Sequence, residues 1–310
     1  ASLALPALAR AQAAPTLKLV VGYPAGATSD TLTRALAEHM AGTLKQTVIV
    51  ENKPGAGGRI GNEVVKAAPA DGTTLLMTPI ATMGIFPHSY AGQLRYDPFK
   101  DFAPVAHLAN FHVGLGVGNA VPAKTLAEYV AWVKGQGGKG SVGIPAPAST
   151  PEFLVKVMDE KFGLDLVAAP YRGSGPMLAD MLGNQIAGGV GSVPDFVENH
   201  RAGKLRVLAV LGGARQQALP EVPTFSELGL GGLEDLPYYG VFAPAGTPKA
   251  FVDQFSAAVA KVIAQPEVRR QLQQMGLTVE HMGPDQLARR ERSYAQAWTR
   301  IVRNSGFQPQ

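Results

Sequence analysis

Short apolar runs alternate with longer amphipathic stretches along the 310 residues of the chain. LKLVV at residues 17–21 predicts a strand, and residues 31–41 predict a helix because apolar side chains recur there at helical spacing. VIVEN at 48–52 and TTLLMT at 73–78 predict two more strands, with a helix over about 61–68 between them. This βαβαβ order favours a parallel sheet flanked by helices.

A second series of alternating elements follows. FAPVAHL and HVGLGV, within residues 102–117, predict two strands with a break at Asn110, and helices and strands then alternate as far as LRVLAV at 205–210. YYGVFAPAGTP, from Tyr238, predicts a strand that returns to the first series, and two helices are expected after it. We therefore expect two α/β lobes that can hinge around a ligand. Residues 15–115 and 236–310 form lobe 1, and residues 116–235 form lobe 2.

The first 14 residues, ASLALPALARAQAA, differ from the rest of the chain. They are rich in alanine, carry one charge at Arg10 and end in small residues, as the last part of a secretory signal peptide does. A disordered tail and a first helix are the alternatives. We expect residues 1–14 to be a signal remnant that is cleaved on export to the periplasm.

Composition and charge narrow the possible chemistry. The chain has no cysteine, which excludes disulfides, thiolate catalysis and cysteine-ligated zinc. Its net charge is +4, and part of the positive excess lies near the C-terminus, at Arg269, Arg270, Arg289, Arg290, Arg292, Arg300 and Arg303. A nucleic-acid interface would interleave such residues with aromatic side chains. That pattern is missing from the sequence, so we interpret these residues as solvated helix faces and expect no nucleic-acid partner.

The loop YPAGATSD at residues 23–30 joins the first strand to the first helix. Its small residues, Gly26 and Ala27, allow a ligand to approach the backbone. Thr28 and Ser29 can cap the helix, and Asp30 suits the first turn. The free amides of a helix start favour an anion, although an ordinary capped turn is the alternative. No lysine follows the glycine, so this is not the phosphate loop of nucleotide hydrolases.

Three further loops place small and hydroxyl-bearing residues between a strand and a helix. They are GIPAPASTPEFL at 143–154, PYRGSGP at 170–176 and GVGSVPD at 189–195. Because ligands of open α/β sheets bind at the carboxyl ends of strands, we expect the four loops to face one cleft. By contrast, NKPGAGGRIG at 52–61 misses the register of the dinucleotide-binding glycine motif by one residue and predicts only a glycine-rich turn.

Catalytic motifs are weak in this sequence. Its six histidines form no HExxH pair, and Ser174 in RGSG lacks the first glycine of the GxSxG elbow. A hydrolase of carboxylate esters would need a nucleophile and a base, and Ser192 with His107 or His112 is the pair to consider. We expect no enzyme activity, no metal and no cofactor.

Eight segments together resemble those of the periplasmic solute-binding receptors of tripartite tricarboxylate transporters, the Bug-type receptors. They are YPAGATSD, ENKPGAGGRIG, APADGTTLL, LRYDPFKDFAPVAHL, PYRGSGPMLADMLGNQIAGG, AGKLRVLAV, ALPEVPTFSELGL and YYGVFAPAGTP. The resemblance implies a two-lobe α/β Venus-flytrap fold of type II, each lobe being a mainly parallel sheet flanked by helices. It also implies a monomeric receptor that captures a small carboxylate (a dicarboxylate, an amino acid or an aromatic acid) and delivers it to permease subunits. A receptor that presents the same ligand to a signalling protein is the alternative.

The resemblance also implies a set of ligand-binding residues. In this family the ligand's carboxylate is typically held by backbone amides and hydroxyls of the loops. Carried over to lobe 1, the residues are Tyr23, Ala27, Thr28, Ser29, Asp30, Thr78 and Met83. Those of lobe 2 are Ala148, Ser149, Thr150, Tyr171, Ser192 and Asp195.

The chain departs from the family pattern in two loops, so its substrate is expected to differ. Ala148 and Glu152 stand where the family often has glycine and histidine, and Ala25 and Ala27 stand where glycine is frequent. Asp195 has two interpretations. As an unpaired acid in the cleft it favours a ligand with an amine or hydroxyl donor, and otherwise it caps its helix.

Overall fold

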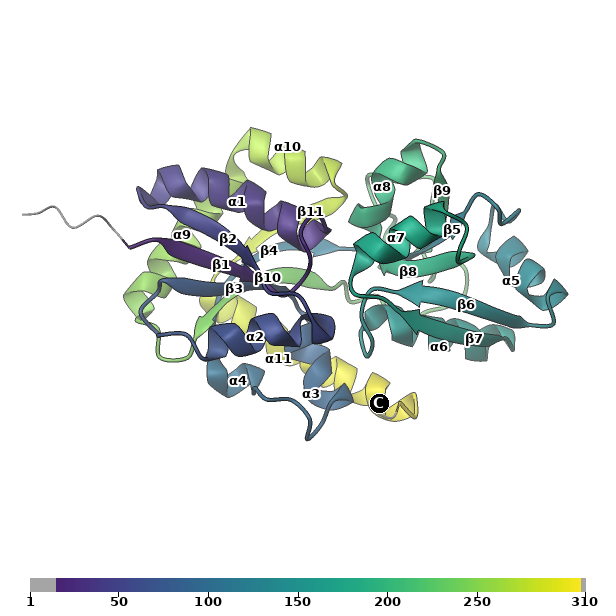
Figure 1. Ribbon diagram of the computed structural model, residues 1–310, viewed down its shortest axis with the longest axis horizontal. Coiled ribbons are helices and arrows are strands. Elements are labelled where there is room, and N and C mark those ends of the chain that lie inside the picture. Colours follow the sequence, from purple (N-terminus) through teal and green to yellow (C-terminus); the bar gives the residue numbers. More distant parts are fainter. Residues whose placement is uncertain (1–14, 308–310) are drawn as a thin grey trace, which may run out of the picture.

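The structure is a computed structural model that describes residues 15–307, so the predicted signal remnant lies outside the described residues. Two lobes lie side by side, and each is a β-sheet with helices on both faces (Figure 1). The predicted two-lobe α/β architecture is therefore confirmed. No helix of the described part is both long and apolar enough to cross a membrane.

Lobe 1 is built on a six-stranded sheet in the order β11-β4-β10-β3-β1-β2. Its strands are β1 (Leu17–Val21), β2 (Val48–Asn52), β3 (Thr74–Pro79), β4 (Phe102–Phe111), β10 (Tyr238–Pro244) and β11 (Leu277–Met282). β1 pairs in parallel with β2 and β3, whereas β10 is antiparallel to β3 and β4. The sheet is therefore mixed rather than mainly parallel as predicted, because the chain returns from lobe 2 in the opposite direction and both β10 and β11 are antiparallel to their neighbours.

Helices cover both faces of this sheet, as the nearly continuous apolar run of β1 requires. Leu17, Leu19 and Val21 pack in the core cluster that includes α1 and α9, and Val20 packs in the cluster of α2 and α11. The helical elements of lobe 1 are α1 (Thr28–Leu44), η1 (Ala56–Gly58), α2 (Arg59–Lys66), η2 (Ala81–Ile85), α3 (Phe86–Ser89), α4 (Pro98–Asp101), α9 (Lys249–Ala264), α10 (Pro266–Gln274) and α11 (Pro284–Asn304).

Lobe 2 is built on a five-stranded sheet in the order β7-β6-β8-β5-β9. Its strands are β5 (Val113–Gly118), β6 (Lys139–Ile144), β7 (Asp165–Pro170), β8 (Gly188–Ser192) and β9 (Leu205–Val210). β5 is antiparallel to both neighbours, and β6 is parallel to β7 and β8. The helices of this lobe are α5 (Leu126–Gly135), α6 (Thr150–Phe162), α7 (Ser174–Leu182) and α8 (Val193–Arg201).

The break between the two strands at the crossing lies two residues later than predicted. Asn110 is not a break, because it lies inside β4 and pairs with Tyr238 and with β11. The chain leaves the first sheet at Phe111 and enters the second at Val113, so the break is at His112. Phe111 and the start of β10 therefore lie between the lobes, where they can form part of a cleft.

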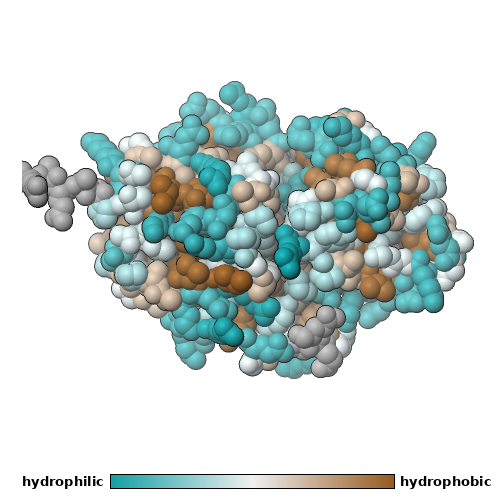
Figure 2. Space-filling view, viewed as in Figure 1, coloured by the Kyte–Doolittle hydropathy of each residue, from teal (hydrophilic) through white to brown (hydrophobic). Residues whose placement is uncertain are grey.

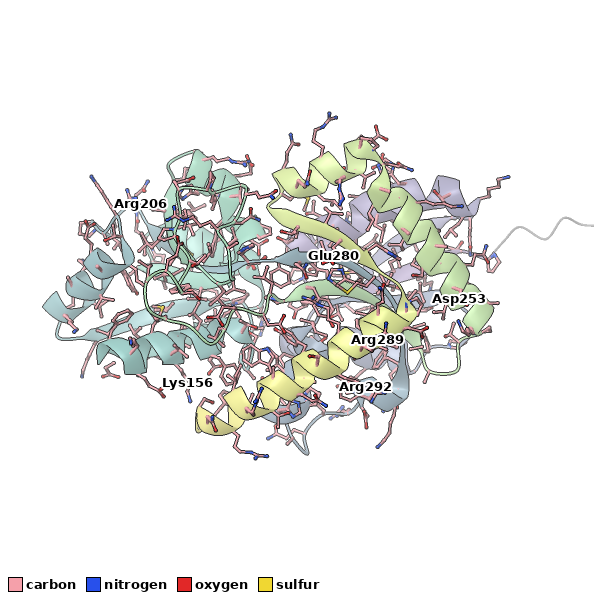
Figure 3. All side chains as sticks on the ribbon, turned by 180° about the vertical axis from the view of Figure 1, so that it is seen from behind. Lys156, Arg206, Asp253, Glu280, Arg289 and Arg292 are labelled. Atoms are coloured by element: carbon pink, nitrogen blue, oxygen red, sulfur yellow. The ribbon has the colours of Figure 1, made fainter. Side chains whose placement is uncertain are left out.

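The C-terminal part also contains more elements than the two helices predicted. α10 buries only Val268 and Leu272, which is too weak an apolar stripe to mark a separate helix in the sequence. β11 buries Leu277 and Val279 in alternation, and this short strand is also missed. Arg289 and Arg292 project from the exposed face of α11, as predicted for solvated basic residues (Figure 3). The prediction is wrong for Arg290, which is half-buried and donates hydrogen bonds to Asn110 and to the carbonyl of Leu236.

The lobes contact each other on the side of α6 and α11. Phe153 of α6 lies in the aromatic cluster of lobe 1, with its ring centroid 5.2 Å from that of Trp298. Lys156 of the same helix donates a hydrogen bond to the carbonyl of Ser305, at 3.0 Å. The face of the molecule in Figure 2 is mostly hydrophilic, with small apolar groups on each lobe. The contact on the side of α6 and α11 thus combines aromatic packing with a hydrogen bond.

Candidate functional site

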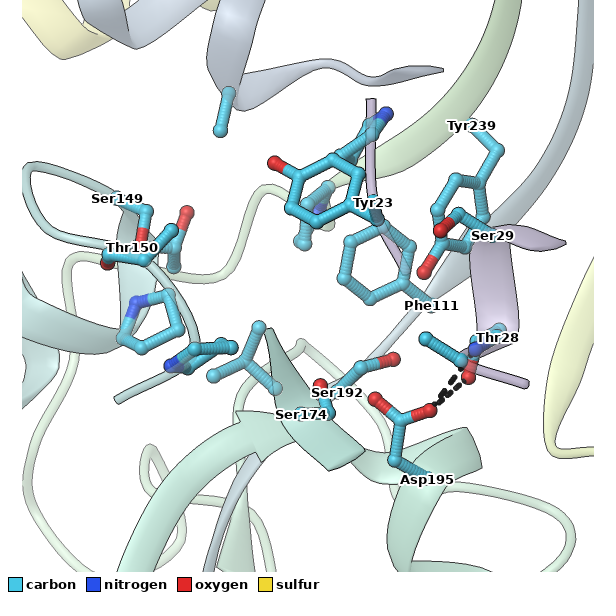
Figure 4. A pocket seen from close by; sticks show the side chains of 18 residues that line it. Tyr23, Thr28, Ser29, Phe111, Ser149, Thr150, Ser174, Ser192, Asp195 and Tyr239 are labelled. Carbon is cyan, nitrogen blue, oxygen red and sulfur yellow. Dashed lines mark hydrogen bonds between the residues drawn. The ribbon is translucent and has the colours of Figure 1, made fainter. Parts of the chain in front are cut away.

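A cavity of about 80 Å³ lies between the lobes (Figure 4). Lobe 1 contributes the loop after β1 and the start of α1, and lobe 2 contributes the starts of α6, α7 and α8. Phe111 and Tyr239 come from the strands next to the crossing segments. The predicted convergence of the four hydroxyl-bearing loops is thus what the structure shows.

The middle of the cavity wall is aromatic. Phe111 and Tyr239 stack with their ring centroids 4.6 Å apart and an interplanar angle of 26°. The Tyr23 ring also lines the cavity, and its hydroxyl donates a hydrogen bond to the carbonyl of Gly57, at 2.9 Å. Burial raises the pKa of Tyr23 well above its usual value, so this hydroxyl keeps its proton as a donor. Such a wall suits the apolar part of a small ligand.

Hydroxyl groups surround this aromatic wall. Six of the lining residues carry one on a serine or threonine, and all six lie at or next to a helix start: Thr28, Ser29, Ser149, Thr150, Ser174 and Ser192. Helix starts carry partial positive charge and free amides. Among the described residues, the lining contains no lysine, arginine or histidine. An anion in this cavity would therefore be held by dipoles and hydroxyls rather than by a salt bridge.

Asp195 of α8 forms a hydrogen-bonded link between the lobes. Its Oδ1 accepts hydrogen bonds from the amide of Thr28, at 3.1 Å, and from the Thr28 hydroxyl, at 2.5 Å (Figure 4). Burial raises the pKa of Asp195, and the hydroxyls of Ser174 and Thr28 offset only part of this effect. The prediction of an unpaired acid is wrong. Asp195 does cap a helix, but the helix is α1 of the other lobe rather than its own.

Other hydroxyls on the wall differ in their partners. The Ser149 hydroxyl donates to the carbonyl of Ala146, at 2.6 Å, so it does not cap α6. The Ser192 side chain is buried, with 8% of the residue exposed, and within residues 15–307 its Oγ finds no hydrogen-bond partner. Ser192 thus presents a buried hydroxyl with an unused capacity to bind a ligand.

Eight of the predicted binding residues line the cavity: Tyr23, Ala27, Thr28, Ser29, Ser149, Thr150, Ser192 and Asp195. The other five lie outside it. Asp30 accepts hydrogen bonds from Gly26 and Arg34; burial would raise the pKa of its carboxyl, but these bonds lower it. Asp30 therefore holds the turn in place.

Thr78 and Met83 are fully buried inside lobe 1, against the prediction that they line the cleft. The Thr78 hydroxyl is hydrogen-bonded to that of Thr82, and the Met83 sulfur accepts from Asn62. Thr78 is turned into the core because β3 is covered on both faces by helices, and Met83 of η2 packs in the cluster of α2 and α11.

Ala148 and Tyr171, from lobe 2, also lie off the cavity wall. Ala148 is buried among aromatic residues of lobe 1, with a φ of 55° that L-residues rarely adopt. The Tyr171 hydroxyl donates to Asp180, at 2.8 Å, and its ring lines a separate outer cavity of about 530 Å³. Conversely, sequence reasoning missed Phe111, Tyr239 and Ser174 as wall residues. Proximity to the crossing strands was the available signal for the first two.

The hydrolase pair considered from the sequence is not assembled. The His107 ring bonds to the Glu280 carbonyl, at 2.7 Å, and to Asn110, at 3.0 Å, inside lobe 1. The His112 ring faces the carbonyl of Ala214, at 3.2 Å. Burial lowers the pKa of both histidines. Neither ring lines the cavity or contacts Ser192, so no base is in place to activate that hydroxyl.

Comparison with known proteins agrees with this geometry. The family model described as "tripartite tricarboxylate transporter family receptor" matches residues 32–307. The chain belongs to this family. It is similar to the protein BugT of Bordetella pertussis, with 28% identity over 306 residues that cover 99% of this chain and 94% of BugT. The resemblance to Bug-type receptors is confirmed.

Two solved structures of similar proteins are complexes with carboxylates. One is the R. palustris protein Rpa4515 with adipate: its TM-score is 0.90 and its identity 26%, over 96% of this chain and 99% of that one. The other is MatC from Rhodopseudomonas palustris with bound malate: its TM-score is 0.85 and its identity 30%, over 93% of this chain and 99% of that one. Two proteins similar to this chain in fold and sequence thus hold small carboxylates.

Proposed function

We propose that this family member is a monomeric periplasmic receptor that captures a small carboxylate and delivers it to the membrane permease of a tripartite tricarboxylate transporter. We propose further that it reaches the periplasm by a cleaved signal peptide and has no enzyme activity. The observation that carries the proposal is the convergence of four helix starts and six hydroxyls on one interlobe cavity. The adipate and malate of the similar structures support a carboxylate as the ligand.

The energetics favour this kind of site for an anion. A buried carboxylate loses its hydration, and hydrogen-bond donors must offset the free-energy cost of that loss. Amides of a helix start are already oriented, so they can donate without rearrangement. Each charge-assisted hydrogen bond contributes roughly 1.5–3 kcal/mol, so two or three of them account for micromolar binding together with an apolar wall.

Ser192→Ala tests the placement of the site. Since Ser192 Oγ makes no hydrogen bond within the described part of the chain, its removal should leave the melting temperature of the free protein unchanged. Carboxylate binding should weaken roughly 10- to 100-fold, the loss of one charge-assisted hydrogen bond. Ser141→Ala, on an exposed position of β6, is the matched control and should bind normally.

The ligand itself can be identified by native mass spectrometry of the protein purified without added ligand, followed by analysis of the denatured extract. If the purified protein holds no ligand, a thermal-shift screen of carboxylates follows. A ligand that binds only the folded state raises the midpoint temperature of unfolding. Unchanged binding in Ser192→Ala would place the pocket elsewhere. A screen in which no carboxylate shifts the midpoint would refute the receptor proposal.

A further inference from the structure

The start of α1 is the place in lobe 1 where an anion would bind, and it is already occupied by a carboxylate of the protein. Asp195 accepts from both the amide and the hydroxyl of Thr28. A ligand carboxylate at the same position would have to displace Asp195 and leave its charge without these two donors. It would also lie beside that charge if Asp195 stayed in place.

The opposite wall of the cavity has no carboxylate on its surface, because Glu152 in the first turn of α6 does not line the cavity and instead accepts a hydrogen bond from the Ala148 amide, at 2.6 Å. Ser149 and Thr150, at the start of α6, lie across the cavity from Asp195 and Thr28 (Figure 4). The Ser149 hydroxyl is turned to Ala146, so it does not compete for the amides of this 13-residue helix. Ser192, with its unused hydroxyl, lines the same cavity. One anionic group can therefore be accommodated on the lobe 2 side.

Between these walls the surface of the cavity is aromatic. The stacked rings of Phe111 and Tyr239, with Tyr23, form its middle. Of the residues that line it, Asp195 is the only one with an acidic side chain, and none of those described is cationic. A second negative charge on the ligand would therefore meet one carboxylate and no compensating cation.

We propose that Asp195 is a specificity-determining residue that excludes a second ligand carboxylate, so that this receptor selects small monocarboxylates with an apolar body. The inference rests on the proposed function, because it assumes a carboxylate ligand in this cavity. It separates this chain from the two similar proteins described with adipate and malate, each of which is a dicarboxylate. The magnitude follows from Coulomb's law: two unit charges about 5–6 Å apart at an effective dielectric constant of ~20 change affinity roughly 100-fold.

The test compares ligands that differ by one carboxylate, namely hexanoate with adipate and butanoate with succinate, by calorimetric titration at pH 7.5. The wild type should bind each monocarboxylate at least ~30-fold more tightly than its dicarboxylate partner, allowing for solvent screening. Asp195→Asn keeps an oxygen that can accept from Thr28 and removes the charge. This variant should lower the ratio of monocarboxylate affinity to dicarboxylate affinity at least tenfold. Glu198→Gln, an exposed acid on the same helix, is the matched control and should leave the ratio unchanged.

The outcomes separate the two proposals. Equal binding of the two kinds of ligand by the wild type overturns the selectivity, while the carboxylate receptor stands. An unchanged ratio in Asp195→Asn shows that another residue makes the distinction and overturns the assignment to Asp195. If that variant does not fold, the wild-type ratio alone still decides whether the selectivity exists. If neither kind of ligand binds, the proposed function fails and this inference fails with it.

Discussion

Helix α11 carries a carboxyl group within its buried stripe. Glu291 shares this stripe with Leu287, Tyr294 and Trp298, and only 2% of its surface is exposed. Within the described residues its Oε1 has no hydrogen-bond partner. Burial raises the pKa of Glu291 to about 8, and the charge of Arg292 offsets this only in part. The folded protein therefore keeps Glu291 protonated at neutral pH.

The pKa shift of Glu291 fixes how stability changes with pH. The folded state holds the proton up to about pH 8, whereas the unfolded chain releases it near 4.5. The contribution of Glu291 to stability is thus fully present below pH 4.5. It is lost as pH rises toward 8, where the loss levels off. A shift of this size corresponds to at most ~5 kcal/mol, and relaxation of the site should reduce this to a few kcal/mol.

Glu291→Gln tests this account because glutamine keeps the shape of the side chain without the proton equilibrium. At pH 8 the free energy of unfolding of the variant should be about 2–4 kcal/mol higher than that of the wild type, and the difference should shrink toward pH 5. Urea unfolding followed by circular dichroism at half-unit pH steps measures both curves. Glu38→Gln, at an exposed position on α1, is the control and should run parallel to the wild type. Parallel curves for Glu291→Gln and the wild type would refute the reasoning.

Two further predictions concern the cleft. Thr28→Val removes the hydroxyl that donates to Asp195, so urea unfolding should show a loss of roughly 1–3 kcal/mol, whereas Thr43→Val at the exposed end of α1 should cost less than 1 kcal/mol. An equal loss in both variants would contradict the link between the lobes. Gly58→Ala should lower the free energy of unfolding by roughly 1–2 kcal/mol, because φ is 99° there and the new Cβ would lie 3.0 Å from the Tyr23 ring. A variant as stable as the wild type in the same assay would show that this turn tolerates a side chain.

Much of the fold follows from local patterns in the sequence. The strands of both lobes are short apolar runs, and the loops between them and the helices carry glycine, proline and hydroxyl residues, so both could be predicted. The four loops converge because they share one position relative to the sheet, the carboxyl ends of strands. β11 and α10 were missed because each buries only two apolar side chains in its regular pattern.

The details of the site depend on contacts between distant residues. Asp195 and Thr28 are 167 positions apart, and their hydrogen bonds exist only because the lobes are close together. No local pattern could show that the anion site of α1 would be filled by the protein itself. The same holds for the stack of Phe111 on Tyr239, which joins two strands of lobe 1 at the crossing. Sequence reasoning therefore found the loops but not the distribution of charge among them.

The most direct test of the central claim is a calorimetric titration that compares a carboxylate with its neutral amide, such as hexanoate with hexanamide. The two ligands have nearly the same shape, and only the first offers a charge to the helix starts. We predict that hexanoate binds with a Kd in the micromolar range, and that hexanamide binds at least ~30-fold more weakly. Equal binding of the two, or binding of the amide alone, would contradict a receptor that holds its ligand by the carboxylate.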